Sequence, residues 1–112
     1  MSEWQNLIPL ADLEPGDVTP VSIGRLQLAV YDRPDDVHVT LARCTHGGAD
    51  LCDGYLDGHV IECPLHQGCF DIRDGRPLEA PATRALKTFP ARRQGRFVQV
   101  KLPAATRTSA DC

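Results

Sequence analysis

Alternation between apolar and polar residues runs through both ends of the chain. Residues 25–31 place Leu26, Leu28 and Val30 on one face, and residues 37–41 follow the same pattern. A polar, aspartate-rich segment containing a proline lies between the two runs and is typical of a hairpin loop. The pattern predicts two half-buried strands joined as a hairpin.

Shorter runs extend the pattern toward both termini. A strand is expected around Trp4 and another over residues 18–23, and residues 86–93 and 97–102 are expected to form a terminal hairpin. No segment has the apolar spacing of an amphipathic helix of useful length. The sequence therefore predicts an all-β fold, a small antiparallel β-sandwich or barrel.

The middle of the chain differs from both ends. Residues 43–81 are rich in glycine and contain only short apolar runs, which predicts a loop-rich subdomain inserted into the β base. A chain of 112 residues has the length of one ordinary domain, expected over residues 1–103. Residues 104–112 are small and polar, and we expect them to form a flexible tail.

Charge and hydropathy exclude some classes of partner. The formal net charge is −3, so no basic surplus is present to bind nucleic acid. The longest apolar stretch is far shorter than the roughly 20 residues that span a bilayer, so no membrane partner is expected. The first ten residues lack the pattern of a secretory signal, and we expect a cytoplasmic protein.

Two short motifs in the glycine-rich segment combine cysteine with histidine. They are Cys44-Thr-His46 and Cys63-Pro-Leu-His66. Two Cys and two His are the ligands of a Rieske-type [2Fe–2S] cluster, in which His replaces Cys on one iron. The same four residues could form a tetrahedral zinc site, although zinc fingers usually pair Cys with Cys and His with His. The spacing favours the cluster over structural zinc.

Longer segments surround the two motifs. They read Cys-Thr-His-Gly-Gly-Ala-Asp-Leu, then Asp-Gly-Tyr-Leu-Asp-Gly-His-Val-Ile-Glu-Cys-Pro-Leu-His-Gln-Gly, then Phe-Asp and Gly-Arg-Pro. Together they resemble the Rieske ferredoxins of bacterial ring-hydroxylating dioxygenase systems. The resemblance implies a Rieske fold in which Cys44 and Cys63 bind the inner iron, and His46 and His66 bind the outer iron near solvent. It also implies a loop over the cluster, supplied by residues 80–82.

The same resemblance implies an electron carrier and not an enzyme. The protein would take single electrons from a flavin-containing, NAD(P)H-dependent reductase and pass them to the terminal Rieske oxygenase of an aromatic-ring dioxygenase system. Both contacts would be transient, and no small-molecule substrate would bind. No catalytic carboxylate pair, nucleophile triad or phosphate-binding loop is present in the sequence. Two alternatives are a Rieske-like small subunit of a reductase such as nitrite reductase, and a zinc-stabilised binding module.

Four further positions predict the reduction potential. Respiratory Rieske proteins of high potential have bridged cysteines where this chain has Ala49 and Leu65, and hydroxyl donors where it has Gly68 and Phe70. Hydrogen bonds to the cluster sulfurs stabilise the reduced cluster, and a site with fewer of them has a lower potential. The resemblance therefore predicts a potential at the negative end of the Rieske range, roughly −150 mV.

The remaining cysteines and histidines are not expected to bind the cluster. Cys52 and Cys69 are predicted to be small, partly buried thiols, and Cys112 an exposed terminal thiol. The other two histidines, His38 and His59, are predicted to face solvent. Four acidic residues around the motifs form either a docking surface for a basic partner or a solvated turn face: Asp50, Asp53, Asp57 and Glu62.

Overall fold

Among the described residues, the regular structure is strand apart from two short 3-10 helices. The computed structural model describes residues 4–43, 50–64, 68–79 and 85–102. Its elements are β1 (Trp4–Pro9), the 3-10 helix η1 (Leu10–Asp12), β2 (Val18–Ile23), β3 (Leu26–Asp32), β4 (Val37–Leu41), the 3-10 helix η2 (Leu51–Asp53), β5 (Tyr55–Asp57), β6 (Val60–Glu62), β7 (Cys69–Asp71), β8 (Pro77–Glu79), β9 (Thr88–Phe89), β10 (Ala91–Gln94) and β11 (Phe97–Lys101). The predicted all-β antiparallel class is confirmed.

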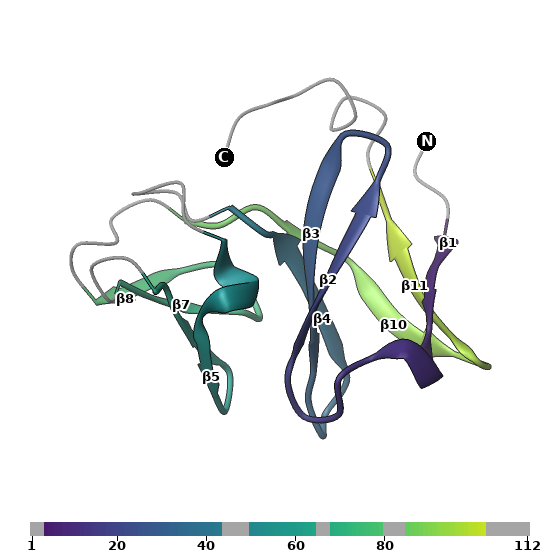
Figure 1. Cartoon of the computed structure of the whole chain (residues 1–112), viewed down its shortest axis with the longest axis horizontal. Helices are drawn as coiled ribbons and strands as arrows, with labels where there is room; N and C mark the ends of the chain where they lie inside the picture. The colour runs from purple at the N-terminus through teal and green to yellow at the C-terminus, as the bar shows by residue number, and fades with distance from the viewer. Residues whose placement is uncertain (1–3, 44–49, 65–67, 80–84, 103–112) are drawn as a thin grey trace.

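Within the described residues these strands form three antiparallel sheets. One has the order β1-β11-β10 and a second has the order β2-β3-β4-β9; we call these two sheets the base. The third has the order β5-β6-β7-β8 and is called the lobe. Figure 1 shows the lobe beside the base, next to β3 and β4. The lobe is more regular than the predicted loop-rich segment, because its three-residue strands pair in sequence order.

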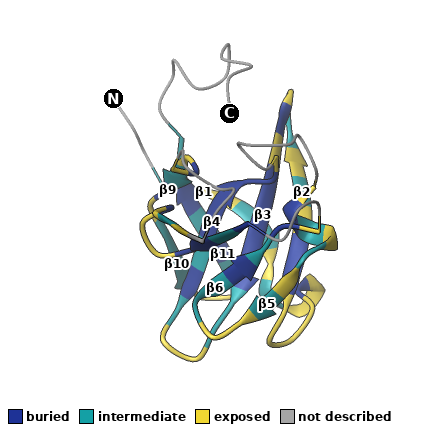
Figure 2. Ribbon diagram, turned by 90° about the vertical axis from the view of Figure 1, so that its left-hand side faces the viewer, coloured by how far each residue is buried: buried dark blue, intermediate teal, exposed yellow. Residues whose placement is uncertain are grey.

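Strand β3 is buried on both faces from Leu28 to Tyr31, which corrects the prediction of a half-buried strand over these residues, whereas Gln27 is exposed. Leu28 and Val30 lie in the core between the two base sheets, which also contains residues of β4 and β11. Ala29 and Tyr31, on the opposite face, pack into a second core with residues of the lobe. All four side chains have 0% exposure, and Figure 2 shows the burial concentrated along β3. The lobe, which is distant from β3 in the sequence, thus buries the second face of this strand.

The strand predicted over residues 86–93 is interrupted at Pro90, so the expectation of one continuous arm is wrong. β9 pairs with β4, whereas β10 pairs with β11 in the other base sheet. Proline has no backbone N–H for a sheet ladder, and it favours a break between strands. The chain thereby crosses from one base sheet to the other. Across the described part of the chain, no helix has the length and apolar character needed to cross a bilayer.

Candidate functional site

The two predicted ligand motifs lie in segments whose ends are held together by backbone pairing. The first segment, residues 44–49, is flanked by Arg43 and Asp50, which form an isolated antiparallel bridge. Next to this bridge the Leu51 N–H donates to the Ala42 carbonyl at 2.7 Å. The ends of this segment are therefore fixed against the base and η2.

The second segment begins at Cys63, directly after β6. The Cys63 N–H donates to the carbonyl of Gly68 at 2.7 Å, which joins the two ends of this segment immediately before β7. Cys44, His46 and His66 lie outside the described residues, as does the predicted covering loop at residues 80–82. Of the four predicted ligands, the structure therefore places only Cys63.

The Cys63 side chain is fully buried, with 0% exposure. It lies in the core shared by lobe and base, among apolar side chains that include Leu51, Ile61 and Phe70. A thiolate is the form that binds metal, and it is not stable in apolar surroundings without a compensating positive charge. A ferric ion supplies that charge. The burial and the sulfur donor of Cys63 therefore fit an inner-iron ligand.

Close backbone packing precedes Cys63. Gly54, at the start of the β5–β6 hairpin, lies so near the carbonyl of Glu62 that an added Cβ would be 2.2 Å from its oxygen. Any side chain at residue 54 would push β6 away from η2. Glycine at this position thus sets where the residue before Cys63 lies.

A buried carboxylate organises the turn that follows β7. Asp71 accepts hydrogen bonds from Arg73, at 3.0 Å from Nε and 2.7 Å from Nη2, and a longer one of 3.3 Å from Arg76 Nη2. The Asp71 side chain is 4% exposed, whereas the two arginine side chains are 55% and 60% exposed. Hydrogen bonding from Arg73 lowers the pKa of Asp71 to about 2, although burial opposes this shift.

This turn also attaches the lobe to the base. The Gly75 N–H donates to the Asp71 carbonyl at 2.7 Å, and the Leu86 N–H donates to the Gly75 carbonyl at 2.8 Å. Gly75 has φ +81, and an added Cβ would lie 2.2 Å from the Leu86 oxygen. Only glycine fits this contact, because its conformation and its packing both exclude a side chain.

Two of the cysteines not predicted as ligands, Cys52 and Cys69, occupy half-buried positions. Cys52 lies in η2, where its N–H donates to the Asp50 carboxylate at 2.8 Å. Burial and the nearby carboxylate of Asp50 raise the pKa of the Cys52 thiol to about 12. Cys69 begins β7 and is also half-buried. Cys112 lies outside the described residues.

The acidic residues around the motifs differ in exposure. Asp50, Asp53 and Asp57 are exposed, while Glu62 is half-buried. Asp50 has a structural role as the N-cap of η2. A docking role for this group stays a prediction.

The two histidines that were predicted to face solvent are instead half-buried, and both contact Asp35. The His38 and His59 side chains are 18% and 30% exposed, and both are hydrogen-bonded to the Asp35 carboxylate at 2.9 Å. His38 lies on β4 of the base and His59 lies in the β5–β6 turn of the lobe, so the sequence contained no signal that they meet. Only the packing of the lobe against the base brings them together.

Comparison with known proteins places the chain in one family. Residues 3–90 match the family model of the Rieske [2Fe-2S] domain. The ferredoxin component of the naphthalene 1,2-dioxygenase system of Pseudomonas aeruginosa is 41% identical over 100 residues, which cover 89% of this chain and 96% of that protein. The chain therefore belongs to the Rieske [2Fe-2S] family, and it carries a Rieske-type cluster.

Two solved structures with higher similarity come from ferredoxins or their complexes within this family. The ferredoxin of Sphingomonas yanoikuyae B1 matches with a TM-score of 0.82 and 37% identity, over 90% of this chain and all of that one (100%). A chain in the complex of reduced oxygenase and oxidized ferredoxin in carbazole 1,9a-dioxygenase matches with a TM-score of 0.78 and 39% identity, over 87% and 91% of the two chains. The resemblance to dioxygenase ferredoxins is confirmed: the protein is an electron carrier and not a catalytic oxygenase.

A more distant structure bears on the predicted alternative. A Mycobacterium tuberculosis protein described as the small subunit of an NADH-dependent nitrite reductase matches with a TM-score of 0.78 over 93% of this chain and 98% of that one. Its identity is only 22%, so this likeness shows the fold alone. The relative at 41% identity is instead the ferredoxin component of a dioxygenase system.

Proposed function

We propose that this ferredoxin passes single electrons from a flavin-containing, NAD(P)H-dependent reductase to the terminal Rieske oxygenase of a system that dihydroxylates aromatic compounds. The observation that carries the proposal is the 41% identity to a naphthalene dioxygenase ferredoxin over 96% of that protein. The similar chain in a complex of ferredoxin with oxygenase supports the oxygenase as one partner. Both contacts are transient, because a shuttle must leave one partner to reach the next.

We assign the four cluster ligands as Cys44 and Cys63 on the inner iron and His46 and His66 on the outer iron. The burial of Cys63 and the paired ends of both motif segments support this assignment. When bound, the cluster supplies one-electron chemistry with no open coordination position for a substrate. The buried apolar surroundings of Cys63 exclude water from the inner side of the site.

Substitution of cysteines tests this assignment. Cys63→Ala should abolish the red-brown colour and the electron paramagnetic resonance signal of the reduced protein, because alanine has no atom that can bind iron. Cys52→Ala is the matched control and should retain both signals, since Cys52 is expected to play no part in binding. Retention of the signals in Cys63→Ala, or their loss in Cys52→Ala, would contradict the assignment.

The proposed reduction potential is low for a Rieske site, roughly −150 mV. Phe70 supports this value, because its buried side chain has no hydroxyl to donate to sulfur. Gly68 likewise offers no side-chain donor, and Ala49 and Leu65 lie outside the described residues. Voltammetry of the purified protein measures the potential directly, and a value at the positive end of the Rieske range would contradict the reasoning.

The domain assignment and the compartment are part of the same proposal. A single domain over residues 1–103, a lobe over about 43–81 and a C-terminal tail over 104–112 account for the chain. The two cores that share β3 support one cooperative unit. We place the protein in the cytoplasm, because the proposed reductase draws on NAD(P)H.

Reconstitution tests the electron path. The purified ferredoxin is combined with NADH and with the reductase and terminal oxygenase of a naphthalene 1,2-dioxygenase system, and product formation is measured. We expect turnover that depends on the ferredoxin and a complex too weak to survive gel filtration. Tight co-purification with a nitrite reductase from the native cell would instead favour the small-subunit alternative.

A further inference from the structure

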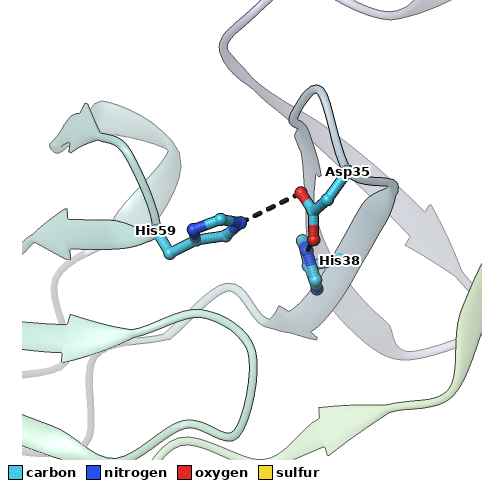
Figure 3. A group of neighbouring side chains, drawn as sticks. All are labelled: Asp35, His38 and His59. Carbon is cyan, nitrogen blue, oxygen red and sulfur yellow. Dashed lines mark hydrogen bonds and ion pairs between the residues drawn. The ribbon is translucent and has the colours of Figure 1, made fainter.

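A carboxylate and two imidazoles meet where the lobe faces the base. Asp35 lies in the loop between β3 and β4, His38 lies on β4, and His59 lies in the β5–β6 turn of the lobe. Figure 3 shows both imidazoles directed at the one carboxylate. The His38 Nε2 is 2.9 Å from Asp35 Oδ2, and the His59 Nε2 is 2.9 Å from Asp35 Oδ1.

The three donor atoms have the spacing of a metal site. One ligand atom from each residue lies within 4.8 Å of the other two. Ligands at zinc bond lengths of about 2.0–2.2 Å are separated from one another by about 3–4 Å. Small side-chain movements are therefore enough to admit an ion. The imidazole rings lie edge to face, with centroids 5.4 Å apart, so they do not stack over the position between the three donors.

The surroundings allow an ion to enter and leave one negative charge free to bind it. The side chains of Asp35, His38 and His59 are 47%, 18% and 30% exposed, so water can complete the coordination. His38 also lines a surface pocket with Ile72 and Arg73. Arg73 interacts electrostatically with Asp35, but its guanidinium donates hydrogen bonds to Asp71. The carboxylate thus remains available as an anionic ligand.

We propose that Asp35, His38 and His59 bind one divalent transition-metal ion of the Zn²⁺, Cu²⁺ or Ni²⁺ class, separate from the iron–sulfur cluster. Two imidazole nitrogens and one carboxylate suit these ions, whereas Mg²⁺ and Ca²⁺ prefer oxygen ligands alone. Each imidazole binds through an unprotonated Nε2 and keeps its proton on Nδ1. The bound ion connects the lobe to the base, because two of its ligands come from the base and one from the lobe.

Zinc titration of the intact ferredoxin tests the site. Zn²⁺ is added to oxidised protein in a non-chelating buffer at neutral pH, with binding followed by calorimetry and cluster integrity by visible absorption. The background carries Cys52→Ser, Cys69→Ser and Cys112→Ser, so that the three thiols outside the proposed cluster ligands do not compete. We expect one bound ion, and a loss of affinity of about tenfold or more in His59→Gln and in Asp35→Asn, because each removes one of three protein ligands.

Asp57→Asn is the matched control. It removes the same charge as Asp35→Asn, from the β5–β6 hairpin that carries His59, and Asp57 does not belong to the proposed metal site. It should leave the affinity within about twofold of the parent, as expected for an exposed charge outside the site. Binding of Zn²⁺ should also raise the unfolding temperature of the parent but not of His59→Gln, because an ion that binds only the folded state stabilises it.

A second measurement identifies the ligands. Cu²⁺ bound to the oxidised protein should show hyperfine splitting from two nitrogens, and from one nitrogen in His59→Gln. The proposal is overturned if the parent binds no Zn²⁺ at millimolar concentration, if His59→Gln and Asp35→Asn bind it unchanged, or if uptake occurs only as the cluster absorption is lost. The electron-transfer assay is independent of these results, so failure of one proposal leaves the other standing.

Discussion

The buried ion pair after β7 provides a quantitative prediction. In Asp71→Asn the side chain keeps its shape but loses the charge that binds Arg73 and Arg76. Asp71 is 4% exposed and joins the turn to which the lobe and the base are both attached. The variant should therefore fold with its cluster but unfold at a lower temperature.

The size of the effect follows from the pKa of Asp71. Its value falls from 3.8 to about 2 in the folded protein. Each pH unit between folded and unfolded pKa values is worth about 1.4 kcal/mol, so the charged carboxylate contributes about 2 kcal/mol at neutral pH. For a domain of this size that corresponds to about 8 °C in the unfolding temperature. The pKa of Asp71 is lower in the folded protein than in the unfolded chain. This contribution to stability is therefore complete above pH 3.8 and is lost as the pH falls toward 2.

Thermal unfolding followed by circular dichroism and by cluster absorption measures this loss. All proteins are heated at the same rate, because loss of the cluster makes unfolding irreversible. Asp74→Asn is the control, since Asp74 lies in the same turn but is exposed, and asparagine can still accept the hydrogen bond from the Arg76 N–H. The reasoning is refuted if Asp71→Asn unfolds within about 2 °C of the parent at neutral pH, or no earlier than Asp74→Asn.

Three further changes test other contacts. Gly75→Ala should destabilise the protein by at least about 2 kcal/mol in thermal unfolding, because the new Cβ meets the Leu86 carbonyl and φ is +81; an unchanged midpoint would contradict this. Tyr31→Phe should lower the free energy of unfolding by only about 1 kcal/mol. Thr40 loses the Tyr31 hydroxyl but keeps its 2.9 Å hydrogen bond to the Leu41 carbonyl. Iodoacetamide should label Cys52 in the native protein tens of times more slowly than in the unfolded chain at mildly alkaline pH, as mass spectrometry can show. The raised pKa of about 12 reduces the thiolate fraction about a thousandfold, and the greater nucleophilicity of that thiolate offsets only part of this.

The local pattern of the sequence determined much of this protein. Alternation predicted β2, the β3–β4 hairpin and the final strand, because side chains on a strand repeat every two residues. The Cys-x-His and Cys-x-x-His motifs predicted the class of cofactor, because few metal centres combine these donors in this way. Both kinds of information lie within short stretches of chain, where composition and spacing are sufficient.

Contacts between distant segments were decided only by the tertiary structure. Ala29 and Tyr31 look like the less apolar face of a strand, and their burial depends on a lobe that begins only at Tyr55. The sequence shows a proline at position 90, which disfavours a continuous strand. It does not show that β9 and β10 pair with different sheets. His38 and His59 meet through Asp35 for the same reason: the packing of lobe on base sets that distance, and no local spacing encodes it.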